Sequence, residues 1–97
     1  FRRKINRPVI FPKEKLDLRF FYENPYVKDS CFYNLVGVIH HYGDVNYGHY
    51  VADCKIGSKW YNYDDSKVSE SDYSFGSKEI SSTTGYILFY EKNLKNY

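Results

Sequence analysis

The chain has 97 residues, enough for one small domain or for a piece of a larger one. Its 14 basic residues nearly balance 12 acidic ones, which does not favour nucleic acid as the main partner, because phosphate-binding proteins usually carry a clustered basic face. No segment is long and apolar enough to cross a membrane, so no membrane partner is expected, and no signal peptide opens the chain.

The first third of the chain predicts a basic segment, two short strands and a loop. The basic residues at its start indicate a solvated segment or a linker: Arg2, Arg3, Lys4 and Arg7. Apolar segments follow at 9–12 and 16–18, and Pro12 should lie at a strand end or on an edge, because proline cannot donate to a ladder. Residues 23–31 predict a loop.

The middle of the chain predicts an antiparallel meander. Aromatic residues make up 21% of the sequence, and tyrosine and phenylalanine favour strands over helices. Residues 33–42 are rich in β-branched and aromatic side chains, which is typical of a strand. A glycine-bounded turn at 43–48 leads to a strand at 49–56, and the pair 57–58 connects it tightly to a strand at 59–63.

The last third of the chain predicts a polar connection and a final strand. Residues 69–84 are rich in serine, with one short helical turn expected near 72–75. Residues 85–90 form a nearly continuous apolar run, which predicts a central strand buried on both faces.

His49 and Asp64 are the candidate catalytic pair. His49 begins one predicted strand and Asp64 follows the next, and the tight turn lies at similar distances from both, so an antiparallel hairpin brings them together. A thiol or hydroxyl nucleophile needs such a pair: an imidazole as base and a carboxylate that orients it. By spacing alone, a loop-edge histidine and an ordinary acidic turn at Asp64 and Asp65 are the favoured explanation, since histidines and acids near turns are common.

The cysteines Cys31 and Cys54 are too few for a disulfide scaffold, although they could pair with each other. We expect free thiols in a reducing compartment, and therefore a protein of the cytoplasm, the nucleus or both.

Several motifs in one order resemble the ubiquitin-specific protease family of cysteine deubiquitinases. Their residues are Val9–Pro12 with Leu16–Leu18, Tyr33–Val38 with His41 and Gly43, Gly48–Ala52, Trp60–Val68 and Gly85–Tyr90. The likeness covers nearly the whole chain, and a set of ordered motifs is more specific than any one of them. It implies an α+β class: an antiparallel sheet that forms the palm and fingers portion of a papain-like cysteine protease fold, mostly β within this chain.

The resemblance also assigns roles to the candidate residues. His49 is implied to be the general base, Asp64 the residue that orients it, and Asp65 a supporting acid. The loop at 43–48 is implied to lie over the C-terminal tail of ubiquitin, where a glycine allows close approach of the backbone. The implied tail-binding residues are His41, Gly43, Tyr47, Gly48 and Tyr50, although packing within the strand explains Tyr50 equally well. His40 points to the other face of its strand and is expected to be a structural or surface histidine.

The chain departs from the family in one respect: it lacks the N-terminal box that carries the nucleophilic cysteine. Cys31 precedes a strand in a polar loop, and Cys54 lies five positions after His49 and therefore on the opposite strand face, so neither is expected to be the nucleophile. Paired Cys-x-x-Cys zinc ligands are also missing, so we expect no metal and no cofactor.

Residues 1–97 are therefore predicted to be the C-terminal part of a ubiquitin-specific protease catalytic domain, inactive and poorly folded alone because an open sheet leaves edges and apolar surface exposed. The expected partners are ubiquitin, ubiquitinated proteins and the N-terminal part of the domain, and the expected reaction is hydrolysis after the terminal glycine of ubiquitin. An inactive ubiquitin-binding scaffold is the alternative, and another papain-like hydrolase is disfavoured by the motif order.

Overall fold

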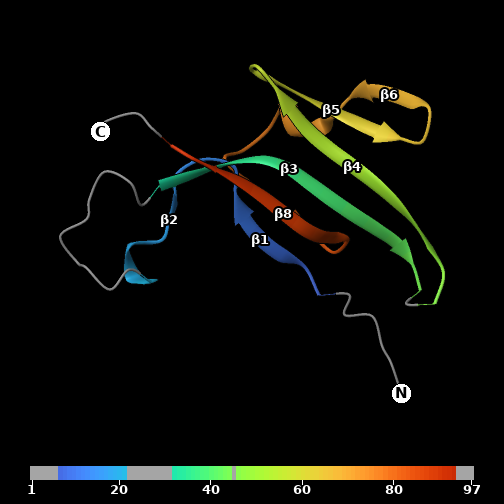
Figure 1. Ribbon diagram of the computed structural model, residues 1–97, viewed down its shortest axis with the longest axis horizontal. Coiled ribbons are helices and arrows are strands. Elements are labelled where there is room, and N and C mark those ends of the chain that lie inside the picture. Colours follow the sequence, from blue (N-terminus) through green and yellow to red (C-terminus); the bar gives the residue numbers. More distant parts are fainter. Residues whose placement is uncertain (1–6, 22–31, 45, 94–97) are drawn as a thin grey trace.

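The computed structural model describes residues 7–21, 32–44 and 46–93, and strands dominate these ranges (Figure 1). The strands are β1 (Val9–Pro12), β2 (Leu16–Asp17), β3 (Phe32–Gly43), β4 (Gly48–Ile56), β5 (Lys59–Asp64), β6 (Lys67–Glu70), β7 (Glu79–Ser82) and β8 (Gly85–Lys92). The helices are two short 3-10 turns, η1 (Arg19–Phe21) and η2 (Asp72–Ser74). Neither has the length and apolar character that a membrane span would need.

The main sheet contains the predicted meander. Its order is β2-β3-β4-β5-β6, all consecutive pairs are antiparallel, and β8 pairs with β3, while β1 and β7 form a separate two-stranded sheet. The tight turn at Gly57 has φ +65°, a backbone conformation that glycine adopts without steric cost. Pro12 is the last residue of β1, as expected from its missing amide hydrogen.

The stretch predicted to be a polar connection, 69–84, contains the end of β6, the helical turn η2 and the whole of β7. The predicted helical turn is confirmed as η2, with the Ser71 side chain accepting a hydrogen bond from the Tyr73 amide. Strands β6 and β7 were not predicted, because serine and charged residues dominate both and neither shows a clear apolar alternation. The loop expected at 23–31 lies outside the described residues, as do Cys31 and the first six residues.

The prediction of a central, doubly buried strand at 85–90 is wrong. Among the described strands, β8 pairs only with β3, and Ile87 and Phe89 are 41% and 48% exposed. An apolar run alone does not distinguish a central strand from an edge strand whose outer face is apolar.

The hydrophobic core lies on one face of the main sheet, beneath residues 69–84. It consists of Phe11, Leu35, Val38, Trp60 and Ile80, with Tyr73, Leu88 and Tyr90 packed against it. Since side chains alternate along a strand, the same face of the sheet also carries His40 and Tyr42 from β3 and Asp53 from β4.

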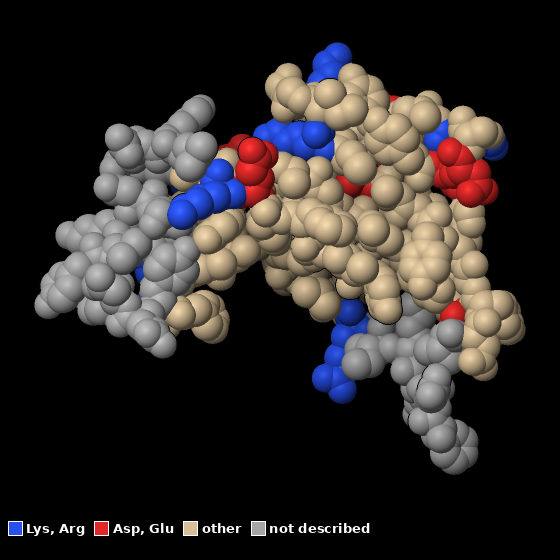
Figure 2. All heavy atoms as spheres, in the orientation of Figure 1, with Lys and Arg blue, Asp and Glu red and all other residues tan. Residues whose placement is uncertain are grey.

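The opposite face of the sheet is apolar and aromatic, and no described segment covers it. Tyr50, Tyr86, Ile87 and Phe89 are all large and exposed. Figure 2 shows one face of the molecule, whose broad centre is mostly uncharged. The lysine, arginine and acidic side chains of that face lie mainly toward its rim. The predicted exposure of apolar surface is therefore confirmed for the described part of the chain.

Candidate active site

The hairpin of β4 and β5 brings His49 and Asp64 into contact. The Nε2 atom of His49 lies 2.5 Å from Oδ1 of Asp64. The cross-strand pairs run from Ile56 opposite Lys59 to Ala52 opposite Tyr63, which sets the start of β4 diagonally across from the end of β5. The juxtaposition expected from the sequence is present, and both side chains are about half exposed, at 47% and 44%.

The contact fixes which nitrogen of His49 is available for chemistry. A carboxylate accepts hydrogen bonds, so Nε2 of His49 carries the proton that it donates to Asp64. The hydrogen bond that His49 donates to Asp64 is the main cause that raises the pKa of His49 above its ordinary value; desolvation opposes it, and the charges of Asp64 and Asp65 add to it. The opposite nitrogen, Nδ1, has no hydrogen-bond partner among the described residues and is the atom able to accept a proton.

Replacing Asp64 by asparagine should lower the pKa of His49, because the amide no longer carries the charge that favours the imidazolium. The raised pKa also means that the pair stabilises the fold below about pH 6.5, and that this stabilisation is lost as the pH rises through the raised value. An NMR titration of the histidine rings in the complete catalytic domain measures the change in the pKa of His49. His40 and His41 serve as internal references in the same spectra, and an unchanged His49 titration would contradict the assignment.

Asp65 lies in the turn that joins β5 to β6. Its φ of +51° is left-handed, a conformation that aspartate tolerates better than most residues. One ligand atom from each of His49, Asp64 and Asp65 lies within 4.8 Å of the others, so these side chains form the group in the described chain able to hold a metal ion. The group is exposed, and the His49–Asp64 hydrogen bond already accounts for its geometry, so the expectation that no metal is bound stays a prediction.

An aromatic cluster lies on the opposite face of β4, next to His49. The His41 ring packs 4.7 Å from the Tyr50 ring, and both rings lie 6.1 Å from that of Tyr86. Tyr50 therefore packs within the sheet while remaining 58% exposed. The sequence places Tyr86 only in a strand, because its proximity to Tyr50 depends on β8 pairing with β3.

The two glycines at the β3–β4 turn are each required for a different structural reason. Gly43 has φ +109°, which side chains rarely adopt. Gly48 lies against His41, so that a Cβ atom there would overlap the His41 ring and reach 2.6 Å from the carbonyl oxygen of Tyr42. Tyr47 is 76% exposed in the turn, and the Asp44 amide donates to its carbonyl oxygen at 2.8 Å. The predicted loop residues thus surround the start of β4.

Cys54, the cysteine among the described residues, is not placed as a nucleophile. Burial and the charge of Asp53 raise the pKa of the Cys54 thiol, which disfavours the reactive thiolate. Cys54 is half-buried and lies opposite Tyr61 and Gly37, on the sheet face away from Asp53. Cys31 lies outside the described residues.

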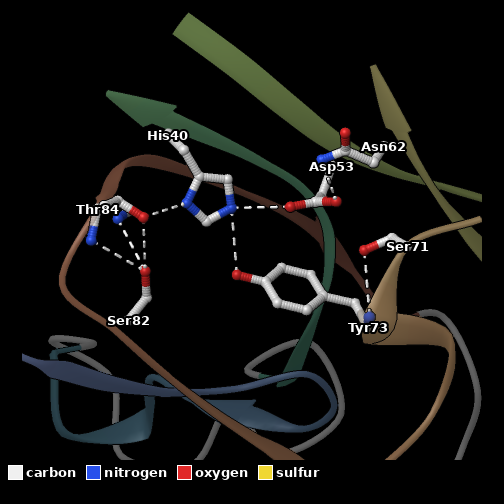
Figure 3. Close-up of polar contacts among 8 residues, drawn as sticks. His40, Asp53, Asn62, Ser71, Tyr73, Ser82 and Thr84 are labelled. Carbon is white, nitrogen blue, oxygen red and sulfur yellow. Dashed lines mark hydrogen bonds and ion pairs between the residues drawn. The ribbon is translucent and has the colours of Figure 1, made fainter. Parts of the chain in front are cut away.

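A second histidine–carboxylate pair, His40 and Asp53, is buried beside the core (Figure 3). The Nε2 atom of His40 lies 2.8 Å from Asp53 Oδ2 and 3.2 Å from the Tyr73 hydroxyl, while Nδ1 lies 2.9 Å from Thr84 Oγ1. The Asn62 amide donates to Asp53 Oδ1 at 3.1 Å. Burial alone raises the pKa of Asp53, but hydrogen bonds from His40, Ser71 and Asn62 outweigh it and hold this pKa below its ordinary value.

The ionised Asp53 settles the tautomer of His40: Nε2 carries a proton and donates it to the carboxylate. His40 is therefore a structural histidine, one of the two possibilities expected for it. The available signal for the pair is Asp53 itself, a charged residue directly between the apolar pair Val51-Ala52 and Cys54.

The described residues thus form an antiparallel sheet that presents a paired histidine and carboxylate beside a glycine-bounded turn, and an imidazole oriented by a carboxylate is the arrangement that general-base chemistry needs. The family model for ubiquitin carboxyl-terminal hydrolase matches residues 1–90. The chain belongs to this family.

Curated relatives agree with the family match. Ubiquitin carboxyl-terminal hydrolase 15 of Rattus norvegicus is 41% identical over 93 residues, covering 94% of this chain and 9% of the relative. The Homo sapiens protein of the same name is 40% identical over 93 residues with the same coverage. Putative ubiquitin carboxyl-terminal hydrolase 11 of Arabidopsis thaliana is 38% identical over 94 residues, covering 95% and 10%. The chain thus spans about a tenth of the length of these relatives.

Solved structures support the fold class. The Ubp8-Sgf11-Sgf73-Sus1 SAGA DUB module superposes with a TM-score of 0.69 at 33% identity, over 88% of this chain and 18% of the matched chain. A SAGA DUB module bound to monoubiquitin gives a TM-score of 0.68 at 36% identity, over 89% and 18%. The antiparallel sheet is therefore part of a papain-like α+β catalytic fold, as the sequence predicted.

Proposed function

We propose that residues 1–97 form the C-terminal part of a thiol-dependent deubiquitinase, which hydrolyses the isopeptide or peptide bond after the terminal glycine of ubiquitin. The observation that carries the proposal is the 2.5 Å contact between His49 Nε2 and Asp64 Oδ1, because it leaves Nδ1 able to act on a nucleophile. The nucleophilic cysteine comes from the N-terminal part of the catalytic domain. The proposed setting is the ubiquitin conjugation pathway of the cytoplasm, the nucleus or both.

The proposed chemistry uses the pair in two steps. His49 Nδ1 takes the proton of the attacking thiol and later returns it to the leaving amine, while Asp64 keeps the ring in its tautomer and stabilises the imidazolium. Asp65 adds negative charge beside the imidazolium, in line with its effect on the pKa of His49. After the amine leaves, water releases ubiquitin from the thioester.

The aromatic cluster is the proposed channel for the ubiquitin tail. His41, Tyr50 and Tyr86 present a cluster of rings, inclined at 48–60° to one another, beside the start of β4, and the turn between Gly43 and Gly48 borders it. A tail that ends in glycine has no Cβ atoms to separate its backbone from these rings. Tyr47, exposed in the turn, is proposed to cover the tail from the other side.

An activity comparison of two proteins tests the proposal. The complete catalytic domain, with its N-terminal part, should release a fluorophore from the C-terminus of ubiquitin, and the 97-residue chain alone should release none. The proposed nucleophile lies outside this chain, and Cys54, the cysteine among the described residues, is a protonated, half-buried thiol. Activity of the isolated chain would refute the proposal that the nucleophile lies in the N-terminal part and the base and orienting acid in this chain. A complete domain that binds ubiquitin but leaves every ubiquitin conjugate intact would support the alternative function of an inactive scaffold.

A further inference from the structure

A polar pocket lies on the same sheet face as His49. It is lined by the next side chains of that face along β3 and β4. Its volume is about 420 Å³, and the His40–Asp53 pair forms part of its wall (Figure 3). Tyr42 also lines the pocket and pairs directly with His49 across β3 and β4, so the two side chains are neighbours on one face. The remaining wall comes from Asn62 on β5 and from residues 69–84, which cross over this face.

The lining of the pocket is suited to a hydrogen-bond donor with positive charge. Every residue that lines it has a hydrogen-bonding side chain, and none is lysine or arginine. The charge of Asp53 is engaged by His40, but Glu70 and Asp72 at the exposed side form no ion pair with a described residue. Hydroxyl groups of serine, threonine and tyrosine supply further acceptor oxygens.

The buried part of the pocket is built to keep its shape. His40 is 4% exposed and connects three separate parts of the chain through Asp53 on β4, Tyr73 on η2 and Thr84 before β8. Burial and the charge of Asp53 raise the pKa of the Tyr73 phenol, so its hydroxyl stays neutral. The network therefore holds residues 69–84 in place above the sheet, with Glu70 and Asp72 at a fixed position.

We propose that this pocket, here called the His40 pocket, binds the ammonium or guanidinium group of a lysine or arginine on the protein from which ubiquitin is removed. The inference rests on the proposed function, in which His49 protonates the departing lysine amine. The substrate polypeptide that carries that lysine must then pass beside His49. Tyr42 is next to His49 and also lines the pocket, so the pocket is adjacent to the path of the substrate. A basic residue near the modified lysine places its charge between Glu70 and Asp72.

The test uses the complete catalytic domain and ubiquitin joined through an isopeptide bond to the lysine of a short peptide. One peptide has arginine or lysine on both sides of that lysine, a second has alanine and a third has glutamate. The basic peptide should be cleaved with a kcat/KM about fivefold above that of the alanine peptide, with the glutamate peptide lowest. The preference should fall when NaCl is raised from about 0.05 to about 0.5 M.

Variants that remove negative charges test whether the preference for basic peptides arises from the His40 pocket. Glu70→Gln combined with Asp72→Asn should bring the basic and alanine peptides to the same rate, while Glu91→Gln, an equally exposed acid on β8 outside the pocket, should keep the preference. Release of a fluorophore from ubiquitin should be the same in all three proteins, because that substrate has no peptide.

Equal rates for the three peptides in the unmodified domain would overturn the inference while leaving the deubiquitinase proposal intact. A drop in fluorophore release in the pocket variant would also overturn it, since the bound cation would then belong to ubiquitin itself. If the unmodified domain released no fluorophore, the proposed function would fail first.

Discussion

His49→Ala in the complete catalytic domain should lower kcat/KM for ubiquitin-fluorophore hydrolysis by about a thousandfold or more, because the proposed proton acceptor is removed. Asp64 then has no imidazole to orient, and no other described histidine can substitute. His40 is 4% exposed and held by Asp53, and His41 packs on the opposite face against Tyr50.

The same variant separates a catalytic role from a structural one. The His49 side chain is 47% exposed, and its hydrogen bond to a described side chain is the one with Asp64, so the free energy of unfolding should change by less than about 0.5 kcal/mol. The dissociation constant for ubiquitin should stay within about twofold, because the lost interaction acts on the reaction rather than on binding. A variant that turned over at a near-normal rate would refute the assignment of His49 as the base.

Gly48→Ala should lower kcat/KM by about a hundredfold, since a displacement of about 1 Å at the start of β4 misplaces His49. The new Cβ atom would overlap the His41 ring and lie 2.6 Å from the Tyr42 carbonyl oxygen, so either the ring or the strand must move. Overpacking of this kind typically costs about 1–3 kcal/mol of unfolding free energy. Activity and thermal unfolding of the purified domain measure the two effects.

Two further variants isolate the cause. Gly37→Ala makes the same substitution on β3, where the nearest atoms would lie at 3.6 Å in ordinary contact, and it should change kcat/KM by less than about twofold. His41→Ala combined with Gly48→Ala removes the ring overlap but keeps the clash with the backbone of Tyr42, so it should restore stability only in part. Wild-type activity of Gly48→Ala alone would show that the turn tolerates a side chain.

The sequence was sufficient for the features that depend on local order along the chain. Alternating aromatic and β-branched residues separated by glycine-bounded turns predicted the β3-β4-β5 meander, and the tight turn predicted that His49 would meet Asp64. Pro12 at a strand end and the helical turn η2 followed from the hydrogen-bonding capacity of single residues. These predictions succeeded because each depends on neighbours in the chain.

The errors arose where pairing partners are distant in sequence. Strand β8 was expected at the centre of the sheet, yet it pairs among the described strands only with β3, so Ile87 and Phe89 stay exposed. Strands β6 and β7 have polar sequences that form strands because β5 and β1 provide hydrogen-bonding edges. Periodicity reports the environment of each side chain but not the identity of the neighbouring strand.

By itself, then, the sequence determined the hairpin and its histidine–carboxylate pair. Only the tertiary structure decided which other residues surround that pair. Tyr86 joins His41 and Tyr50 because β8 aligns with β3, and residues 69–84 close the His40 pocket over Asp53. The physical reason is that local hydrogen bonding sets the register within a hairpin, whereas burial of the core sets which distant segments pack onto each face.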